Sequence, residues 1–383
     1  MREIGLGGLM LDYPLSGSAT YARNLAAMLP VVAPDLRFYL FVRNTPCGVR
    51  GVETRMLSSP LRHLNSGKGV GARTDKLAWE TISLPLASLM RHQSLIHSLY
   101  FAAPLLAAPP IVVTVHDLIP LVVAGYHRSR QSAYYSGLMA AAVKRAAAII
   151  TVSHCAKEDI VRVLHVPPCR VHVTYEAAGE RFRPATDDLH AVRQKYRLPE
   201  RFLLYLGGAE RRKNLETLLR AWSHVSDRMR ALSSSLVVVA NFPEPDALYP
   251  DMRALAEALR VGDTVRFVPR VDEDDKPEVY RSALGFCFPS RYEGFGLPPL
   301  EAMACGVPVI ASNATSLPEV LGNGARLLDP DDIGGWAGSM LHLVESENER
   351  QDLTERGLRR AAAFSWRHTA EETVKVYRQI LDS

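Results

Sequence analysis

Short apolar runs alternate with longer amphipathic segments along most of the chain. Eight runs end near Gly, Pro, Ser or Asp, and they lie at Ile111–Val115, Ala148–Val152, Arg170–Val173, Phe202–Leu206, Leu236–Ala240, Val265–Val268, Gly285–Phe288 and Val307–Ala311. Buried parallel strands have this pattern because both faces of their sheet are covered. Helical periodicity lies between the runs, at Ser132–Arg145, Ala156–Leu164, Asn214–Val225 and Met252–Leu259. The alternation predicts an α/β fold of doubly wound parallel sheets, with ligands at the carboxyl ends of the strands.

A change of pattern near residues 181–200 predicts a boundary between two domains. The sequence Arg181-Phe182-Arg183-Pro184 precedes a polar, helix-like segment, and a new strand begins at Phe202. A chain of 383 residues is long for one hydrophobic core and suits two domains of similar size. We therefore expect an N-terminal domain over 1–183, a linker over 184–197 and a second domain over 198–363. The last segment, 364–383, is expected to form a helix from about 367 to 381.

Composition narrows the class of protein. Apolar residues make up 47% and charged residues 22% of the chain, as in ordinary soluble proteins. The net charge of +4 favours no dedicated nucleic-acid partner. The five cysteines include no CxxC pair, which favours reduced thiols over disulfides or a zinc site. No apolar run is long enough to cross a bilayer, and Glu3 and Asp12 come too early for a signal peptide. These features predict a cytoplasmic protein.

A glycine-containing loop follows the strand at Gly285–Phe288 and leads into a helix with prolines at its first positions. Residues 289–306 read PSRYEGFGLPPLEAMACG. Glycine lets the backbone approach a ligand closely, and the amides at a helix start bind phosphates. Glu293 and Glu301 lie on either side of this potential phosphate-binding site, and Glu301 is expected in the first helical turn. Their carboxylates can accept hydrogen bonds from sugar and ribose hydroxyls. The alternative is that Glu301 merely favours the helix dipole and that Glu293 is a solvated loop residue.

A run of cations follows the first predicted strand of the second domain. Residues 207–214 read GGAERRKN, so Gly207 and Gly208 permit close approach and Arg212 and Lys213 supply positive charge. A departing diphosphate needs such compensation, and without a metal only Arg and Lys provide it. The alternative is a basic helix start exposed to water, although cations there oppose the helix dipole.

In the first domain, the strand Ile111–Val115 ends in the sequence HDLIP, residues 116–120. Functional groups of α/β folds lie at such strand ends, which makes His116 a candidate. The alternative is a structural histidine, with Asp117 capping the next segment.

Together these motifs resemble the signature of the family-4 retaining glycosyltransferases, which have the GT-B fold. The resemblance rests on two glutamates eight positions apart across GFGLPPL, on the following EAMACGVPVIAS, on the cationic run and on HDLIP. These elements occur in the family's order and cover nearly the whole chain. The resemblance implies two Rossmann-like domains facing across a cleft, with the last helix crossing back to the first domain.

The same resemblance assigns roles to the motif residues. Glu293 would contact the donor sugar, Glu301 would contact the ribose, and His116 would face the sugar from the first domain. A larger set would hold the donor's diphosphate: Gly207, Gly208, Arg212, Lys213, Gly294, Phe295, Gly296 and Leu297.

The loop before the first predicted helix matches the family only in part. Residues 16–25 read SGSATYARNL, where the family commonly has Gly-Ile-Gly-Arg-Tyr beside the phosphates. Gly17 and Tyr21 are kept, whereas Ala19 and Thr20 replace the second Gly and the Arg. Gly17 is therefore a candidate donor contact, and a plain turn before a helix is the alternative.

The family's chemistry is transfer of a hexose from a nucleotide diphosphate sugar to a hydroxyl of a glycan or lipid-linked acceptor. It implies surface polysaccharide synthesis, retention at the anomeric carbon, and no cofactor or divalent metal. HDLIP together with SLPE, residues 316–319, occurs in mannosyltransferase-like members and favours GDP-mannose as donor. The acidic clusters at 272–275 and 329–332 suit solvated turns better than metal sites. The basic segment 50–76 suits either a peripheral contact with a membrane's inner face or a solvated loop.

Four other functions are alternatives. A GT-B epimerase would need no acceptor, and a phosphorylase would require inorganic phosphate or a bound cofactor; the paired glutamates argue against both. A non-catalytic sugar-nucleotide-binding protein is disfavoured by the complete set of His116, Lys213 and Glu293. A dehydrogenase is disfavoured because no G-x-G-x-x-G follows the first strand.

Overall fold

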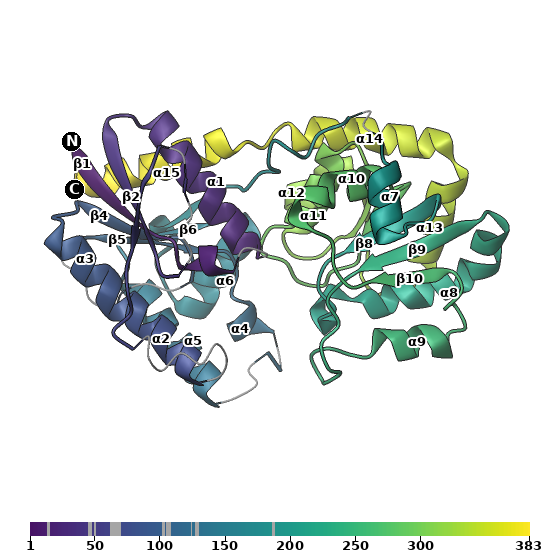
Figure 1. The fold of residues 1–383 in the computed structure, drawn as a ribbon, viewed down its shortest axis with the longest axis horizontal. Helices are drawn as coiled ribbons and strands as arrows, with labels where there is room; N and C mark the ends of the chain where they lie inside the picture. Colours follow the sequence, from purple (N-terminus) through teal and green to yellow (C-terminus); the bar gives the residue numbers. More distant parts are fainter. Residues whose placement is uncertain are drawn as a thin grey trace. The chain divides into compact units, whose positions relative to one another are not determined.

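The computed structural model describes all of residues 1–383 except 14–15, 45–47, 50, 62–69, 102–103, 105–108, 124, 127–129 and 186–187. The chain divides into two compact units. Unit 1 contains Met1–Glu176 and Ser365–Ser383, and unit 2 contains Ala177–Phe364. Each unit is built around one parallel sheet flanked by helices (Figure 1).

Unit 1 has a seven-stranded parallel sheet in the order β3-β2-β1-β4-β5-β6-β7. The strands are β1 Arg2–Gly7, β2 Leu36–Val42, β3 Glu53–Met56, β4 Leu95–Ser98, β5 Ile111–Val115, β6 Ala148–Thr151 and β7 Val171–Val173. The helices are α1 Gly17–Val32, α2 Val70–Ala78, α3 Leu84–Met90, α4 Ile119–Val122, α5 Arg130–Arg145, α6 His154–Leu164 and α15 Trp366–Leu381, with shorter turns η1 Leu9–Asp12, η3 Trp79–Ser83 and η4 Pro168–Arg170. The central strands are buried on both faces, which explains their near-continuous apolar sequences.

The chain ends inside unit 1. Helix α15 packs against α1, and Figure 1 shows both termini beside the same sheet. Arg2 and Asp382 form an ion pair with a distance of 2.8 Å between Nη1 and Oδ1. The helix expected from about 367 to 381 is therefore present as α15, and its residues belong to the N-terminal unit.

Unit 2 has a six-stranded parallel sheet in the order β10-β9-β8-β11-β12-β13. The strands are β8 Arg201–Leu206, β9 Ser234–Val239, β10 Val265–Val268, β11 Gly285–Phe288, β12 Val309–Ser312 and β13 Arg326–Leu328. The helices are α7 His190–Tyr196, α8 Leu215–Ala231, α9 Met252–Ala258, α10 Lys276–Arg281, α11 Leu297–Ala304, α12 Leu317–Leu321, α13 Ile333–Glu345 and α14 Glu347–Ala361, with shorter turns η5 Arg211–Lys213, η6 Glu273–Asp275 and η7 Gly322–Gly324. The strand order reverses between β8 and β11, which makes the carboxyl ends of these two strands the expected ligand site.

The boundary between the units falls earlier than the sequence pattern suggested. Unit 2 begins at Ala177, whereas the first domain was expected to run to residue 183. The expected linker, 184–197, lies within unit 2 and contains α7. All eight predicted strands are present, three of them with the predicted bounds and the other five with ends shifted by one or two residues.

The basic segment 50–76 is only partly described, because Arg50 and residues 62–69 lie outside the described residues. Its last part is not a loop, since α2 begins at Val70. The Lys76 side chain is mostly buried, with Nζ 3.9 Å from Glu80 and over the rings of Tyr100 and Tyr135. Lys76 therefore cannot serve as a solvated surface charge, and membrane contact by the rest of the segment stays a prediction.

The acidic clusters at 272–275 and 329–332 make protein contacts. Asp272 and Asp275 both bind the ammonium of Lys195, and Asp332 caps α13. No helix formed by the described residues is long and apolar enough to cross a membrane.

Candidate active site

The two motifs of the second domain meet where the strand order of unit 2 reverses. β8 leads into residues 207–214, and β11 leads into residues 289–296, and these two parallel strands are neighbours. Arg291 N donates to the carbonyl of Arg212 at 2.7 Å, which joins the two loops directly. The sheet topology therefore brings together residues that lie about eighty positions apart in the sequence.

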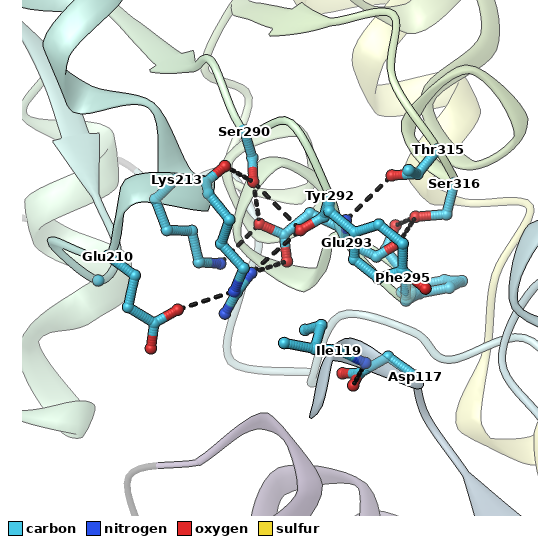
Figure 2. Close-up of polar contacts among 12 residues, drawn as sticks. Asp117, Ile119, Glu210, Lys213, Ser290, Tyr292, Glu293, Phe295, Thr315 and Ser316 are labelled. Carbon is cyan, nitrogen blue, oxygen red and sulfur yellow. Dashed lines mark hydrogen bonds and ion pairs between the residues drawn. The ribbon is translucent and has the colours of Figure 1, made fainter. Parts of the chain in front are cut away.

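At the centre of this junction, Lys213 is paired with Glu293. Lys213 Nζ lies 2.6 Å from Glu293 Oε1, and Arg212 Nη1 lies 3.4 Å from Oε2 (Figure 2). The three side chains are only 10–13% exposed. This burial excludes the alternative readings of a solvated Glu293 and of cations exposed to water.

Charge pairing in this cluster opposes the effect of burial on its ionised groups. Burial disfavours the Glu293 carboxylate, but the charges of Lys213 and Arg212 outweigh it and hold the pKa of Glu293 below its ordinary value. Burial also lowers the pKa of Lys213, and the Glu293 charge opposes that shift. The Arg212 guanidinium is further bound by Glu210, with 2.7 Å between Nε and Oε2. Two cations are thus held close together in a poorly solvated site, as stabilisation of a diphosphate requires.

Small polar side chains fix the position of Glu293. Ser290 Oγ donates to Oε1 at 2.5 Å, and the Glu293 amide donates to Thr315 Oγ1 at 3.0 Å. Ser316 Oγ donates to the carbonyls of Glu293 and Phe295 at 3.0 and 2.9 Å (Figure 2). The sequence motifs did not indicate these contacts, although Ser290 and Ser316 stand inside two of the matched segments.

The glycine-containing loop after β8 is held from both ends. Tyr205, buried in the strand, donates its hydroxyl to the carbonyl of Gly208 at 2.5 Å. Asn214 adopts a left-handed conformation with φ 57°. Its side-chain nitrogen Nδ2 donates to the backbone carbonyls of Pro289 and Pro330. Arg211, which the motif left without a role, donates to the carbonyl of Ala247 at 3.1 Å and ties down the next loop.

The start of α11 suits a close ligand. Gly296 has φ +107°, and a Cβ there would lie 2.6 Å from Leu317 Cδ2, so the position requires glycine. Pro298 and Pro299 occupy the first turn, as the sequence predicted. Prolines have no amide hydrogen, so backbone donors for a phosphate have to come from the segment Gly294–Leu297.

Glu301 is buried deeper in α11 than expected. It is the fifth residue of the helix and therefore lies past the first turn, which weakens the alternative of a dipole role. Burial raises the pKa of Glu301 to about 7, against the nearby charge of Lys276 and a hydroxyl donated by Tyr280 at 3.1 Å. Its ionisation is therefore poised near neutral pH.

The first-domain candidates lie in unit 1. His116 follows β5, and its Nδ1 lies 3.0 Å from Oε1 of Glu176, which sequence reasoning did not identify. Asp117 accepts from the amide of Ile119 at 3.0 Å, as a cap does. Gly17 is the exposed first residue of α1, and Ser16 caps that helix by accepting from the Ala19 amide.

The chain forms two doubly wound parallel sheets. At the switch point of the second sheet lie a buried pair of cations and a glycine-lined helix start. This combination is typical of enzymes that use nucleotide-linked substrates. Comparison with known proteins makes that class specific. Residues 190–360 match the family described as Glycosyl transferases group 1, and residues 16–177 match Glycosyltransferase Family 4.

Individual relatives agree with the family matches. O-antigen chain mannosyltransferase B of Escherichia coli is 33% identical over 269 residues, which are 70% of this chain and 70% of that protein. The serotype-specific mannosyltransferase WbdA of Escherichia coli is 32% identical over 71% of this chain, and the match spans 34% of WbdA. In structure, sucrose-phosphate synthase from Thermosynechococcus elongatus matches with a TM-score of 0.76 at 23% identity, covering 100% of both chains. The chain belongs to the group 1, family 4 glycosyltransferases and has their GT-B fold.

Proposed function

We propose that this glycosyltransferase moves a hexose from a nucleotide diphosphate sugar to a hydroxyl of a glycan or lipid-linked acceptor, with retention at the anomeric carbon. The favoured donor is GDP-mannose. Two relatives named as mannosyltransferases, one of them of the O-antigen chain, support this donor and a role in surface polysaccharide synthesis.

The buried cluster of Arg212, Lys213 and Glu293 carries the proposal. In the reaction, the bond between the anomeric carbon and the β-phosphate oxygen breaks, and the acceptor oxygen bonds to that carbon on the same face. A phosphate oxygen takes the proton of the acceptor hydroxyl. Negative charge grows on the leaving diphosphate, and Arg212, Lys213 and the Gly294–Leu297 backbone stabilise it.

Glu293 serves two purposes in this scheme. Without a donor it neutralises Lys213, which keeps the ammonium extended in a buried position. When the donor binds, Lys213 turns to the diphosphate and Glu293 accepts hydroxyls of the sugar. Glu301 accepts the ribose hydroxyls, and Gly17, Gly207 and Gly208 let the backbone approach the donor closely.

Because Arg212 and Lys213 lie at the proposed diphosphate-binding site, the proposal includes neither a divalent metal nor another cofactor. The acceptor side belongs to unit 1, with His116 facing the sugar. A lipid-linked acceptor would place the enzyme at the cytoplasmic face of a membrane, as a peripheral contact.

A thermal-shift screen tests the donor site directly. We expect GDP to raise the melting temperature more than UDP, ADP or dTDP, with the same shift in the presence of EDTA, because a ligand of the folded state stabilises it. A shift with another base would replace the donor, and a shift lost in EDTA would contradict metal independence. If no nucleotide shifted the melting temperature, the proposed diphosphate-binding site would be wrong. Product analysis with acceptor then separates transfer from epimerisation, phosphorolysis or mere binding.

Nucleotide affinity should depend on pH through Glu301. Only the ionised carboxylate accepts two ribose hydroxyls, and with a pKa of about 7 it loses its charge as the pH falls through neutrality. The dissociation constant of GDP should therefore rise about tenfold from pH 8 to pH 6, as the ionised fraction falls. Glu301→Gln controls for titration of the phosphates, and calorimetry at both pH values should show a smaller change for this variant. Equal pH dependence in the two proteins would contradict the ribose contact.

A further inference from the structure

His116 is held by a carboxylate that no motif indicated. Glu176 lies just after β7 and is the last residue of unit 1 before the chain passes into unit 2. Its side chain is 4% exposed, and its Oε1 lies 3.0 Å from His116 Nδ1. The two residues are sixty positions apart, and the parallel pairing of β5, β6 and β7 brings them to one edge of the sheet.

The imidazole ring is also fixed from the side. Tyr21 of α1 meets it edge-on, with ring centroids 4.7 Å apart and an interplanar angle of 89°. Tyr21 is itself buried, and its hydroxyl lies 3.1 Å from Thr114 Oγ1. Trp366 of α15 packs against Tyr21 from within the same unit. Glu176 and Tyr21 thus both contact the His116 ring, and α15 supports Tyr21 from behind.

Thr114 connects Tyr21 to further buried hydrogen-bonding groups, and none of these groups is charged. Thr114 Oγ1 lies 2.8 Å from His97 Nε2, and His97 Nδ1 lies 2.5 Å from the hydroxyl of Tyr377. Burial lowers the pKa of His97 to about 3, so this second histidine is neutral. The ionisable partner of His116 in this part of unit 1 is therefore Glu176.

The contact with Glu176 determines what the other ring nitrogen can do. A carboxylate offers only acceptors, so Nδ1 of His116 carries the hydrogen. In a neutral ring, Nε2 then has a lone pair and accepts. Nε2 is buried and has no hydrogen-bond partner among the described residues. A buried nitrogen without a partner requires an explanation, and at the carboxyl end of a strand, where α/β folds bind ligands, a bound ligand supplies one.

We infer that Glu176 is a positioning residue, which orients His116 and fixes its tautomer so that Nε2 accepts a hydroxyl of the transferred sugar. This inference rests on the proposed function, which places the donor sugar at His116. Glu176 itself touches no reacting atom. Its effect passes through the imidazole, as with the second partners that orient histidines elsewhere.

The tautomer can be measured without any activity. Long-range ¹H–¹⁵N spectra of histidine-labelled protein distinguish a ring protonated at Nδ1 from one protonated at Nε2, and His116→Gln identifies the signal. We expect Nδ1–H in the native protein and in Glu176→Gln, whose amide oxygen still accepts. In Glu176→Ala the ring should lose this preference. A native ring protonated at Nε2, or an unchanged tautomer in Glu176→Ala, would overturn the inference whether or not transfer is ever detected.

Kinetics then test the consequence for transfer. Glu176→Ala should lower kcat about 10- to 100-fold, the range for removal of a histidine's orienting partner. The donor KM should change less than about threefold, because the nucleotide is bound by residues of unit 2. Glu176→Gln should recover most of kcat. Full turnover by Glu176→Ala would contradict the role.

Glu80→Ala is the matched control. Glu80 is another buried carboxylate of unit 1, and it accepts from the Tyr135 hydroxyl at 3.0 Å without touching His116. If Glu176 were merely structural, both alanine variants would melt earlier and the folded fraction of each would keep its kcat. We expect Glu80→Ala to behave in this way, and Glu176→Ala to lose kcat and the tautomer signal together.

Discussion

Lys213→Ala is expected to lower kcat/KM about a thousandfold, the upper range for removal of one preorganised electrostatic contact. Lys213 is one of two cations at the proposed diphosphate-binding site. Glu293 holds its ammonium in place, with Nζ 2.6 Å from Oε1. Once the side chain is gone, the proposed mechanism leaves Arg212 and the Gly294–Leu297 backbone to stabilise the leaving diphosphate. Initial rates with the preferred donor, measured on protein of confirmed fold, check the prediction.

The same substitution should also reduce stability, which has to be separated from the loss of activity. Removing one partner of a buried ion pair commonly costs about 3–5 kcal/mol because the other charge remains buried. The cost should be smaller here, because Arg212 Nη1 stays 3.4 Å from Glu293 Oε2. The double variant Lys213→Met/Glu293→Gln removes both charges and should recover much of the stability while remaining inactive.

Lys195→Ala provides the control for loss of a lysine in unit 2. Lys195 is half exposed, and its ion pairs with Asp272 and Asp275 lie at the surface, so transfer should be unaffected. Recovery of activity in the stable double variant would show that Lys213 is needed for folding alone. Near-normal turnover by Lys213→Ala itself would remove the residue from the mechanism.

The sequence pattern located strands where burial on both faces leaves a continuous apolar run. Phe202–Leu206 and Leu236–Ala240 are such runs, and they form β8 and β9 of unit 2. β2 has the same kind of sequence, LRFYLFV, and the rule could have found it. β3, with the sequence ETRM, carries no such signal, because its four residues are exposed or only half-buried.

β1 was missed for a different reason. Its sequence, REIGLG, is interrupted by glycines, which normally weaken a strand. In the structure the end of the Gln93 side chain lies against Gly5, so that a Cβ there would lie 2.0 Å from Gln93 Oε1. A close approach of this kind depends on a residue far along the chain, so no local pattern contains it.

The candidate site shows the same division. The motifs identified Lys213 and Glu293 separately, each as a ligand of the donor, because glycines, cations and carboxylates leave a local signature. Their mutual pairing was not predicted, since it depends on β8 and β11 being neighbours. Glu176 was missed because nothing around it in the sequence refers to His116. The sequence alone indicated which residues have ligand-binding side chains. Which residues contact each other became clear only from the order of the strands in the sheets.

The largest loss of stability is expected from Arg43→Met in unit 1. Arg43 follows β2 and is 7% exposed, with Nε 2.9 Å from Asp12 Oδ2 and Nη1 3.1 Å from Asp75 Oδ2. Both carboxylates are buried, at 6% and 1% exposure, and methionine would keep the packing of the stem while removing the positive charge that pairs with both of them. We expect a loss of about 3–5 kcal/mol in the free energy of unfolding.

Urea denaturation should follow this loss separately in the two units, because each has its own sheet and core. The fluorescence of Trp79 and Trp366, both buried in unit 1, should report an earlier transition, in a background where Trp222 and Trp336 of unit 2 are replaced by phenylalanine. Arg37→Met is the control, since Arg37 is 53% exposed and its surface ion pairs should contribute less than about 1 kcal/mol. Adding Asp75→Asn to Arg43→Met should recover part of the loss, because it removes one of the two stranded charges. If Arg43→Met unfolded at the same urea concentration as Arg37→Met, the ion pairs of Arg43 with Asp12 and Asp75 would not stabilise unit 1.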